Sequence, residues 1–185
     1  MIAKRIIKAD LIPEHRTYVE PFGGSASLLF EKEPSKNEVY NDIDGDLVNL
    51  FMVVRDRAEE FKERTKYVLF SRELYETWKD DIGTTDPLER AARTYFLLRA
   101  SFGGKPFRLK PGFAVGRRKQ RASAWVNALD QIDAFRERLR YVTIENLDFR
   151  DCIQRYDCPE TFFFVDPPYF QSPAYYNTFR PKDHE

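Results

Sequence analysis

Four short apolar segments, separated by stretches with a helical pattern, constrain the fold of this chain more than any other feature. They cover residues 18–22, 38–43, 141–147 and 161–165. Between them, apolar side chains recur three or four positions apart, which is the spacing of an amphipathic helix. Strands that alternate with helices are typical of an α/β fold with a parallel sheet. The sequence therefore predicts an α/β fold built on parallel strands.

The expected helices begin and end at recognisable signals. They cover residues 2–12, 26–32, 46–54, 58–67, 71–79, 86–100 and 125–139. Asp46 is expected to cap the third of them, and Asp86-Pro87-Leu88-Glu89 has the cap, first-turn proline and reciprocal acid of a helix start. Glycines and prolines interrupt residues 103–116, which predicts a long basic loop or hairpin.

Composition excludes several classes of protein. The chain has 185 residues, enough for one domain with a core and a small insertion, and its 30 basic and 30 acidic residues balance. Cys152 and Cys158 are too few for a disulfide scaffold, and with His15 and His184 they give no metal-ligand spacing. We expect no metal. No signal peptide or membrane-spanning run is found, so a soluble, cytoplasmic protein is expected.

Asp166-Pro167-Pro168-Tyr169 directly follows the apolar run that ends at Val165. Each proline fixes φ and removes a backbone donor, so the carbonyls there can accept hydrogen bonds without competition. Asp166 adds a carboxylate acceptor, and Tyr169 adds a flat ring with a polar tip. This combination suits a planar ring bearing an amino group, such as a nucleobase taken out of its duplex. An ordinary turn with a capping acid is the alternative reading.

A second group of candidates follows the first two strands. Glycines between a strand and a helix, as in Glu20-Pro21-Phe22-Gly23-Gly24, let the backbone approach a ligand closely. Asp42 ends the second strand, about 20 residues further on, where an acid typically holds ribose hydroxyls. After the third strand, Asp148 could accept from an adenine amino group and Phe149 could stack on its ring. A structural turn, a surface acid and a core phenylalanine are the competing readings.

Taken in order, these motifs resemble those of the Dam-type adenine-specific DNA methyltransferases. The likeness rests on Glu20 to Gly24, Asn41-Asp42-Ile43-Asp44 with Leu47-Val48-Asn49, and Asp166 to Tyr169. It extends to Arg99-Ala100-Ser101-Phe102-Gly103-Gly104 and Phe113-Ala114-Val115-Gly116, and so covers nearly the whole chain. The resemblance implies a Rossmann-like sheet that binds S-adenosylmethionine, and methyl transfer to the exocyclic amine of adenine in double-stranded DNA.

The resemblance also implies a role for each matched residue. The cofactor would be bound by Glu20 and by the segment Pro21, Phe22, Gly23 and Gly24. This segment would line the methionine side of the cofactor. Asp42 would hold the ribose, Ile43 would lie against the adenine ring, and Asp148 and Phe149 would contact that ring's edge and face. Asp166 and the Pro167 carbonyl would accept the target amine's hydrogens, and Tyr169 would stack on the flipped base, with Pro168 completing the catalytic segment.

The segment from Arg99 to Arg121 carries eight basic residues and no acid. They are Arg99, Lys105, Arg108, Lys110, Arg117, Arg118, Lys119 and Arg121. Such a patch is expected to neutralise DNA phosphates, with one or two side chains reading base edges. A solvated charged loop is the alternative.

The expected organisation is a cofactor-binding half over residues 1–56, a target-recognition insertion over 57–140 and a catalytic half over 141–185. Compared with the family, the chain begins just after an aromatic-Gly-Gly-Lys segment, and the strands beyond the catalytic one are missing. The sheet is therefore expected to be incomplete on its C-terminal side. Its apolar edge strand, residues 162–165, would favour self-association or a partner chain. Two other functions stay open: an incomplete fragment that binds only DNA or cofactor, and an amine methyltransferase acting on RNA or protein.

Overall fold

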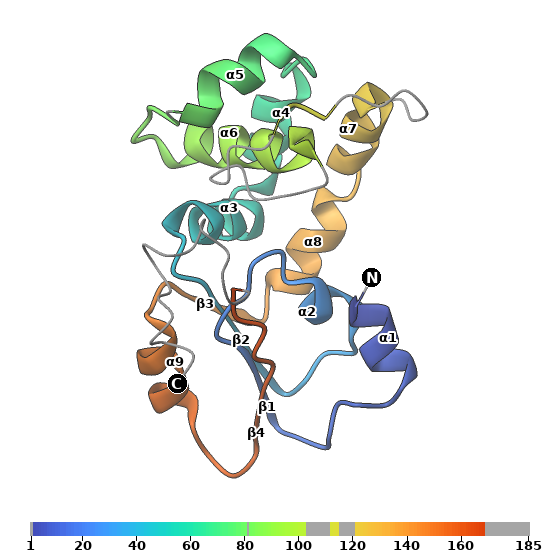
Figure 1. Ribbon diagram of the computed structural model, residues 1–185, viewed down its shortest axis with the longest axis vertical. Helices are drawn as coiled ribbons and strands as arrows, with labels where there is room; N and C mark the ends of the chain where they lie inside the picture. Colours follow the sequence, from blue (N-terminus) through green and yellow to red (C-terminus); the bar gives the residue numbers. More distant parts are fainter. Residues whose placement is uncertain (1, 81, 103–111, 115–120, 169–185) are drawn as a thin grey trace. The chain divides into compact units, whose positions relative to one another are not determined.

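The computed structural model describes residues 2–80, 82–102, 112–114 and 121–168. The chain divides into two compact units, one formed by residues 1–48 and 138–185 and the other by residues 49–137. The first holds the sheet and the second is helical (Figure 1). The predicted division at residues 57 and 140 remains a prediction.

The sheet has four parallel strands, as the alternation of strands and helices predicts. They are β1 (Thr17–Glu20), β2 (Asn37–Asn41), β3 (Val142–Glu145) and β4 (Thr161–Phe163). Their order is β3-β2-β1-β4, and every pair is parallel. Among the described residues, β4 has β1 as its single neighbour, so it is an edge strand as expected. The α/β prediction is confirmed.

Helices cover both faces of this sheet. They are α1 (Ile2–Lys8), α2 (Ser27–Glu31) and α9 (Phe149–Tyr156). On one face, Val19 and Val39 pack against Cys152 of α9. On the other face, the Leu29 N–H of α2 bonds the Glu20 carboxylate. Successive side chains of a strand point to opposite faces, so α2 and α9 lie on opposite sides (Figure 1).

The second unit is built from helices around an aromatic core. These are most of α3 (Gly45–Asp56) and α8 (Ile132–Leu139), together with α4 (Ala58–Lys66), α5 (Arg72–Asp80), α6 (Pro87–Ala100) and α7 (Arg121–Leu129). Tyr75, Trp78, Phe96 and Trp125 form its centre. The Trp125 indole donates to the Val68 carbonyl at 2.9 Å, which satisfies a buried donor. In the described part of the chain, no helix is long and apolar enough to cross a membrane.

Several predicted boundaries were wrong, for local reasons. The first helix ends at Lys8 because Asp10 adopts a left-handed φ of 51°. Asp44, and not Asp46, caps α3, since its carboxylate accepts from the Asp46 N–H at 3.0 Å. The helix predicted over residues 125–139 is two helices, which meet at a turn where the Gln131 N–H contacts the Ala128 carbonyl at 3.4 Å.

The start of α6 is confirmed only in part. Asp86 caps it by accepting from the Glu89 N–H at 2.9 Å, and Pro87 occupies the first turn. The reciprocal half is wrong, because the Glu89 carboxylate instead binds Arg64 and Arg93. Three charge-assisted hydrogen bonds from these two guanidinium groups outcompete one bond from a backbone N–H.

The predicted basic loop or hairpin lies largely outside the described residues, but its two ends are described. Ser101 and Phe113 form an antiparallel bridge. The Phe102 N–H donates to the Gly112 carbonyl at 2.9 Å, and the Ala114 N–H donates to the Ala100 carbonyl at 2.7 Å. The two ends therefore pair as the stem of a hairpin would.

Candidate active site

The carboxyl ends of the four parallel strands bring the predicted cofactor and catalytic residues to one edge of the sheet. Pro21 follows β1, Asp42 follows β2, Asp148 lies beyond β3, and Asp166 lies three residues beyond β4. Parallel strands point the same way, so these loops share an edge. In open α/β sheets, ligands bind at this edge.

The turn after β1 depends on its two glycines for different reasons. A Cβ on Gly23 would lie 2.2 Å from the Tyr40 ring and 2.9 Å from the Asn41 carbonyl oxygen. Gly24 has open space around it, but its φ of +50° is one that side chains rarely adopt. The Ala26 N–H donates to the Gly23 carbonyl at 2.7 Å and closes a tight turn, so the structural turn named as the competing reading is present.

Asp42 holds this turn in place. Its carboxylate accepts from the Gly24 N–H and from the Asp44 N–H, both at 2.8 Å. Burial raises the pKa of Asp42, and this outweighs the two backbone hydrogen bonds, which lower it. Each carboxylate oxygen still has a lone pair that a ligand hydroxyl can use. Ile43, next in the chain, is 52 % exposed.

Glu20 lies deeper than a ligand contact usually does. Its side chain is 2 % exposed, and one oxygen accepts from the Tyr18 hydroxyl at 2.6 Å and from the Leu29 N–H at 2.9 Å. Burial raises the pKa of Glu20 to about 7 despite these two bonds. Glu20 therefore ties β1 to α2, and its predicted cofactor role stays a prediction.

Two predicted aromatic residues meet at this edge. The Phe22 and Phe149 rings lie 4.9 Å apart, and the Arg150 guanidinium lies 4.3 Å from the centre of the Phe149 ring. Asp148 caps α9 by accepting from the Arg150 N–H at 2.9 Å. Its carboxylate thus already has a structural partner, the N–H that it caps. A contact with an adenine ring stays a prediction for both residues.

Sequence reasoning assigned no role to Asn41, which joins the loops after β1 and β3 to the end of β2. Its side-chain amide donates to the Pro21 carbonyl at 2.9 Å and to the Leu147 carbonyl at 3.1 Å, and its oxygen accepts from the Leu147 N–H at 2.8 Å. The side chain is fully buried. An amide with both donors and an acceptor can make all three bonds, which an acid or an aliphatic side chain cannot. The only available signal was its place before Asp42.

The catalytic segment is described in part. The Phe164 N–H donates to the Val19 carbonyl at 2.9 Å, which aligns the start of the segment beside β1. Asp166 is exposed, and Pro167 and Pro168 are half-buried. Tyr169 lies outside the described residues, so its stacking role is an expectation only.

Of the eight predicted DNA-binding residues, Arg99 and Arg121 are described. Lys105, Arg108, Lys110, Arg117, Arg118 and Lys119 lie outside the described residues. Arg99 is exposed on α6, and Arg121 begins α7. In the part of the chain that is described, no group of three metal-ligating side chains is found.

The fold and this edge define a class of protein: a parallel α/β sheet whose first turn is glycine-rich and whose second strand ends in an acid, as in sheets that bind nucleotide-like cofactors. Residues 3–185 match the model of the D12 class N6 adenine-specific DNA methyltransferases. The chain belongs to this family, and the resemblance inferred from its motifs is confirmed.

Individual relatives agree with the family match. The chain is 29 % identical over 171 residues to the Type II methyltransferase M1.LlaDCHI of Lactococcus lactis subsp. cremoris, covering 86 % of this chain and 59 % of the relative. It is 24 % identical over 164 residues to the DNA adenine methylase of Salmonella typhi, and 23 % identical over 164 residues to that of Escherichia coli K12. Each of these alignments covers 85 % of this chain and 58 % of the relative. The chain thus spans less than two thirds of their length.

Proposed function

We propose that this chain transfers a methyl group from S-adenosylmethionine to the exocyclic N6 amine of adenine in double-stranded DNA. One observation carries the proposal beyond family membership. The glycine turn, Asp42 and the segment from Asp166 each follow a strand of the same parallel sheet, at one edge. That edge is where an α/β sheet holds a cofactor beside its substrate.

The residues at this edge fit the cofactor. Gly24 has open space where a Cβ would stand, so a ligand can approach its backbone closely, whereas Gly23 is buried against Tyr40 and shapes the turn. Asp42 has lone pairs for ribose hydroxyls, and Ile43 offers an exposed apolar surface to an adenine ring. S-adenosylmethionine would supply a methyl group bound to a sulfonium sulfur. This sulfur leaves readily as a neutral thioether. The assignment of Pro21, Phe22, Asp148 and Phe149 to the same ligand belongs to this proposal.

The catalytic segment supplies hydrogen-bond acceptors for the target amine. The amine of adenine is a weak nucleophile, because its lone pair is delocalised into the ring. Asp166 and the Pro167 carbonyl would accept hydrogen bonds from the two N–H groups of this amine. These bonds would favour a pyramidal nitrogen with its lone pair directed at the methyl group. The amine gains positive charge as the bond forms, so these acceptors stabilise the transition state more than the ground state. Tyr169 would stack on the flipped base.

DNA would be bound by the basic segment. The family description and the names of the relatives support DNA as the substrate, and the acid-free run from Arg99 to Arg121 offers cations to its phosphates. A role in restriction-modification is supported by the name of the Type II relative. Self-association through β4 remains part of the proposal, since this strand has a free edge among the described residues.

The test is transfer of labelled methyl groups to DNA from a methylation-free host, with Asp166→Ala beside wild type. We expect the variant to lose on the order of 10²-fold or more in rate and to keep its affinity for S-adenosylmethionine, measured by calorimetry. Asp157→Ala is the matched control, since it removes an exposed carboxylate at the end of α9. Label should appear on N6-methyladenine.

Other outcomes favour the other functions. Binding of cofactor or DNA without transfer by the folded wild-type chain would indicate an incomplete fragment. Label on RNA or protein in place of DNA would indicate a different amine methyltransferase.

A further inference from the structure

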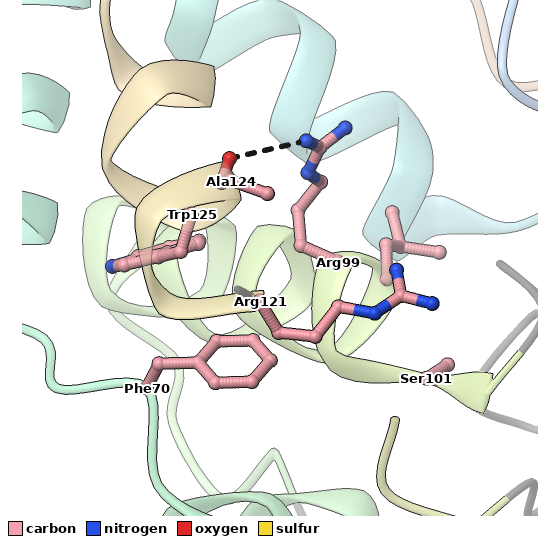
Figure 2. Close-up of a pocket in the computed structure, with 7 residues that line it drawn as sticks. Phe70, Arg99, Ser101, Arg121, Ala124 and Trp125 are labelled. Atoms are coloured by element: carbon pink, nitrogen blue, oxygen red, sulfur yellow. Dashed lines mark hydrogen bonds between the residues drawn. The ribbon is translucent and has the colours of Figure 1, made fainter. Parts of the chain in front are cut away.

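The helical unit contains a cavity of about 170 Å³ that the proposed chemistry does not use. Its lining comprises Phe70, Leu98, Arg99, Ser101, Arg121, Ala124 and Trp125. Figure 2 shows Arg99 reaching it from α6 and Arg121 from the start of α7. Two arginines thus line one pocket, and no acid stands among the described residues that line it.

The polar groups of these arginines are not satisfied by the described part of the chain. The Arg121 Nε is buried and has no hydrogen-bond partner among the described residues. To the described residues Arg99 makes one long bond, from an Nη to the Ala124 carbonyl at 3.4 Å. No described acid forms an ion pair with either arginine, whereas Arg64 and Arg93, in the same unit, share Glu89. A buried N–H without an acceptor is costly, so a ligand that supplies one would bind with a gain.

The pocket favours an ionised ligand with several oxygens. A guanidinium presents its Nε and one Nη as a fork that matches two oxygens of one phosphate or carboxylate. Two positive charges beside one cavity repel each other, and an anion between them removes that repulsion. Apolar walls from Phe70, Leu98 and Trp125 strengthen the attraction, because the local dielectric is lower than that of water. A neutral base edge would satisfy the hydrogen bonds but not the charges.

We propose that Arg99 and Arg121 hold one and the same backbone phosphate of the DNA duplex in this pocket. This inference rests on the proposed function, which makes DNA the ligand. It deepens that function, because two arginines of the basic segment become a single site for one phosphate. The contact fixes the position of the duplex and reads no sequence. The positive end of the α7 dipole lies at Arg121 and adds to the attraction.

The DNA test measures affinity against salt for wild type, Arg99→Gln, Arg121→Gln and the double variant, by fluorescence anisotropy. If both arginines share one phosphate, either one alone still neutralises it. Each single variant should then lose roughly tenfold in affinity and keep nearly the same slope of log K against log salt. The double variant should lower the slope by about 0.9, the value for one phosphate. Losses should be equal on unrelated duplexes.

Arg136→Gln is the matched control, since Arg136 is an exposed arginine of the same unit and lies outside the pocket. A double variant whose slope falls by about 1.8 would mean two separate phosphates and would overturn the shared site. A loss confined to duplexes with one particular base pair would indicate base reading and would also overturn it.

A second measurement tests the pocket without DNA. Inorganic phosphate is titrated into the full chain while the arginine Nε–H signals are followed by NMR. The signal that disappears in Arg121→Gln should shift at millimolar phosphate, and the Arg136 signal should not. A pocket that takes phosphate while the chain shows no DNA binding would mean that the proposed function has failed and the anion site stands. No shift at Arg121 would overturn the site itself.

Discussion

The carboxyl edge of the sheet and the arginine pocket of the helical unit treat their polar groups in opposite ways. At the edge, the Asn41 side chain makes three hydrogen bonds within the chain and the Asp42 carboxylate accepts two. In the pocket, the buried Arg121 Nε makes no hydrogen bond to any residue that the structure describes. Polar groups that have internal partners hold a backbone in shape. Removing a buried donor that has no internal partner costs the folded chain little stability. The function of such a donor is therefore sought in ligand binding. This difference can be tested by substitution.

Asn41→Leu should have the largest effect. It leaves the Pro21 carbonyl and both backbone groups of Leu147 without a partner, each worth about 1–3 kcal/mol when buried. We expect a loss of about 4 kcal/mol in the free energy of unfolding, measured with urea. Asn146→Leu is the control, because Asn146 is exposed and makes one bond, to the Asp42 carbonyl. Equal losses in both variants would show that Asn41 does not organise the edge.

Gly23→Ala should cost about 3 kcal/mol, because the new methyl group would overlap the Tyr40 ring and the Asn41 carbonyl. It should also weaken binding of S-adenosylmethionine, since the turn has to move. Gly24→Ala is the comparison, since its cost comes from φ alone and should be about 1 kcal/mol. Thermal unfolding and calorimetry of both variants separate overlap from backbone strain. The reverse ranking would contradict the packing described for Tyr40.

Glu20 adds a further case to the comparison of polar groups with and without internal partners. Its carboxylate accepts two hydrogen bonds, and yet burial raises its pKa more than these bonds lower it. The folded chain binds its proton with a pKa of about 7, against 4.5 for an ordinary glutamate. Between these values the folded state holds more protons than the unfolded state, so stability falls as pH rises from about 4.5 to about 7. Glu20→Gln removes this loss, and we expect it to be about 2 kcal/mol more stable than wild type at pH 8.

The control for this pH dependence has the opposite sign. Burial opposes ionisation of Glu38 as well, but its bonds to Arg138 and Lys32 outweigh burial and lower the pKa of Glu38. Its contribution to stability is therefore present above pH 4.5 and is lost as pH falls below that value. Glu38→Gln should destabilise the chain at pH 8, and urea unfolding across pH 4 to 8 measures both variants. A Glu20→Gln variant that is less stable than wild type at pH 8 would show that its hydrogen bonds outweigh burial.

Arg121→Met should have the smallest effect on stability, within about 0.5 kcal/mol of wild type, because the buried Nε that it removes makes no hydrogen bond to a described residue. The methionine keeps the apolar stem of the side chain in the pocket. The same substitution should weaken DNA binding, so stability and affinity separate at this residue. Urea unfolding at constant salt measures the first. A large loss of stability would mean that Arg121 supports the helical unit, and the contrast with Asn41 would not hold.

Local signals predicted much of this structure. Apolar runs predicted the four parallel strands, and Asp86 with Pro87 predicted the start of α6. The edge residues after β1 and β2 were also found in this way, because strand ends are marked by glycine and acids. Long-range partners could not be predicted. Asn41 meets Leu147, and Arg99 meets Arg121 around one pocket, only once the chain has folded.

The boundary errors have the same origin. Asp44 and Asp46 are equally good capping residues by type. Which of them caps α3 depends on where β2 ends and on the hydrogen bonds of Asp42, which binds both the Asp44 N–H and the glycine turn. Similarly, Glu89 has the right spacing for a capping box, but its carboxylate forms an ion pair with Arg64 of another helix instead. Neither competitor is visible in a local window of sequence.

The order of the strands has a consequence for how the chain folds. The helical unit is one continuous segment, residues 49–137, whereas the sheet draws on segments from both sides of it. Thr17 of β1 pairs with Thr161 of β4, so this contact must wait until the chain has been made through β4. Contacts distant in sequence form slowly, because their loop-closure entropy has to be overcome first. We therefore expect the helical unit to form early on the ribosome, while β1 and β2 stay exposed to chaperones until β3 and β4 emerge.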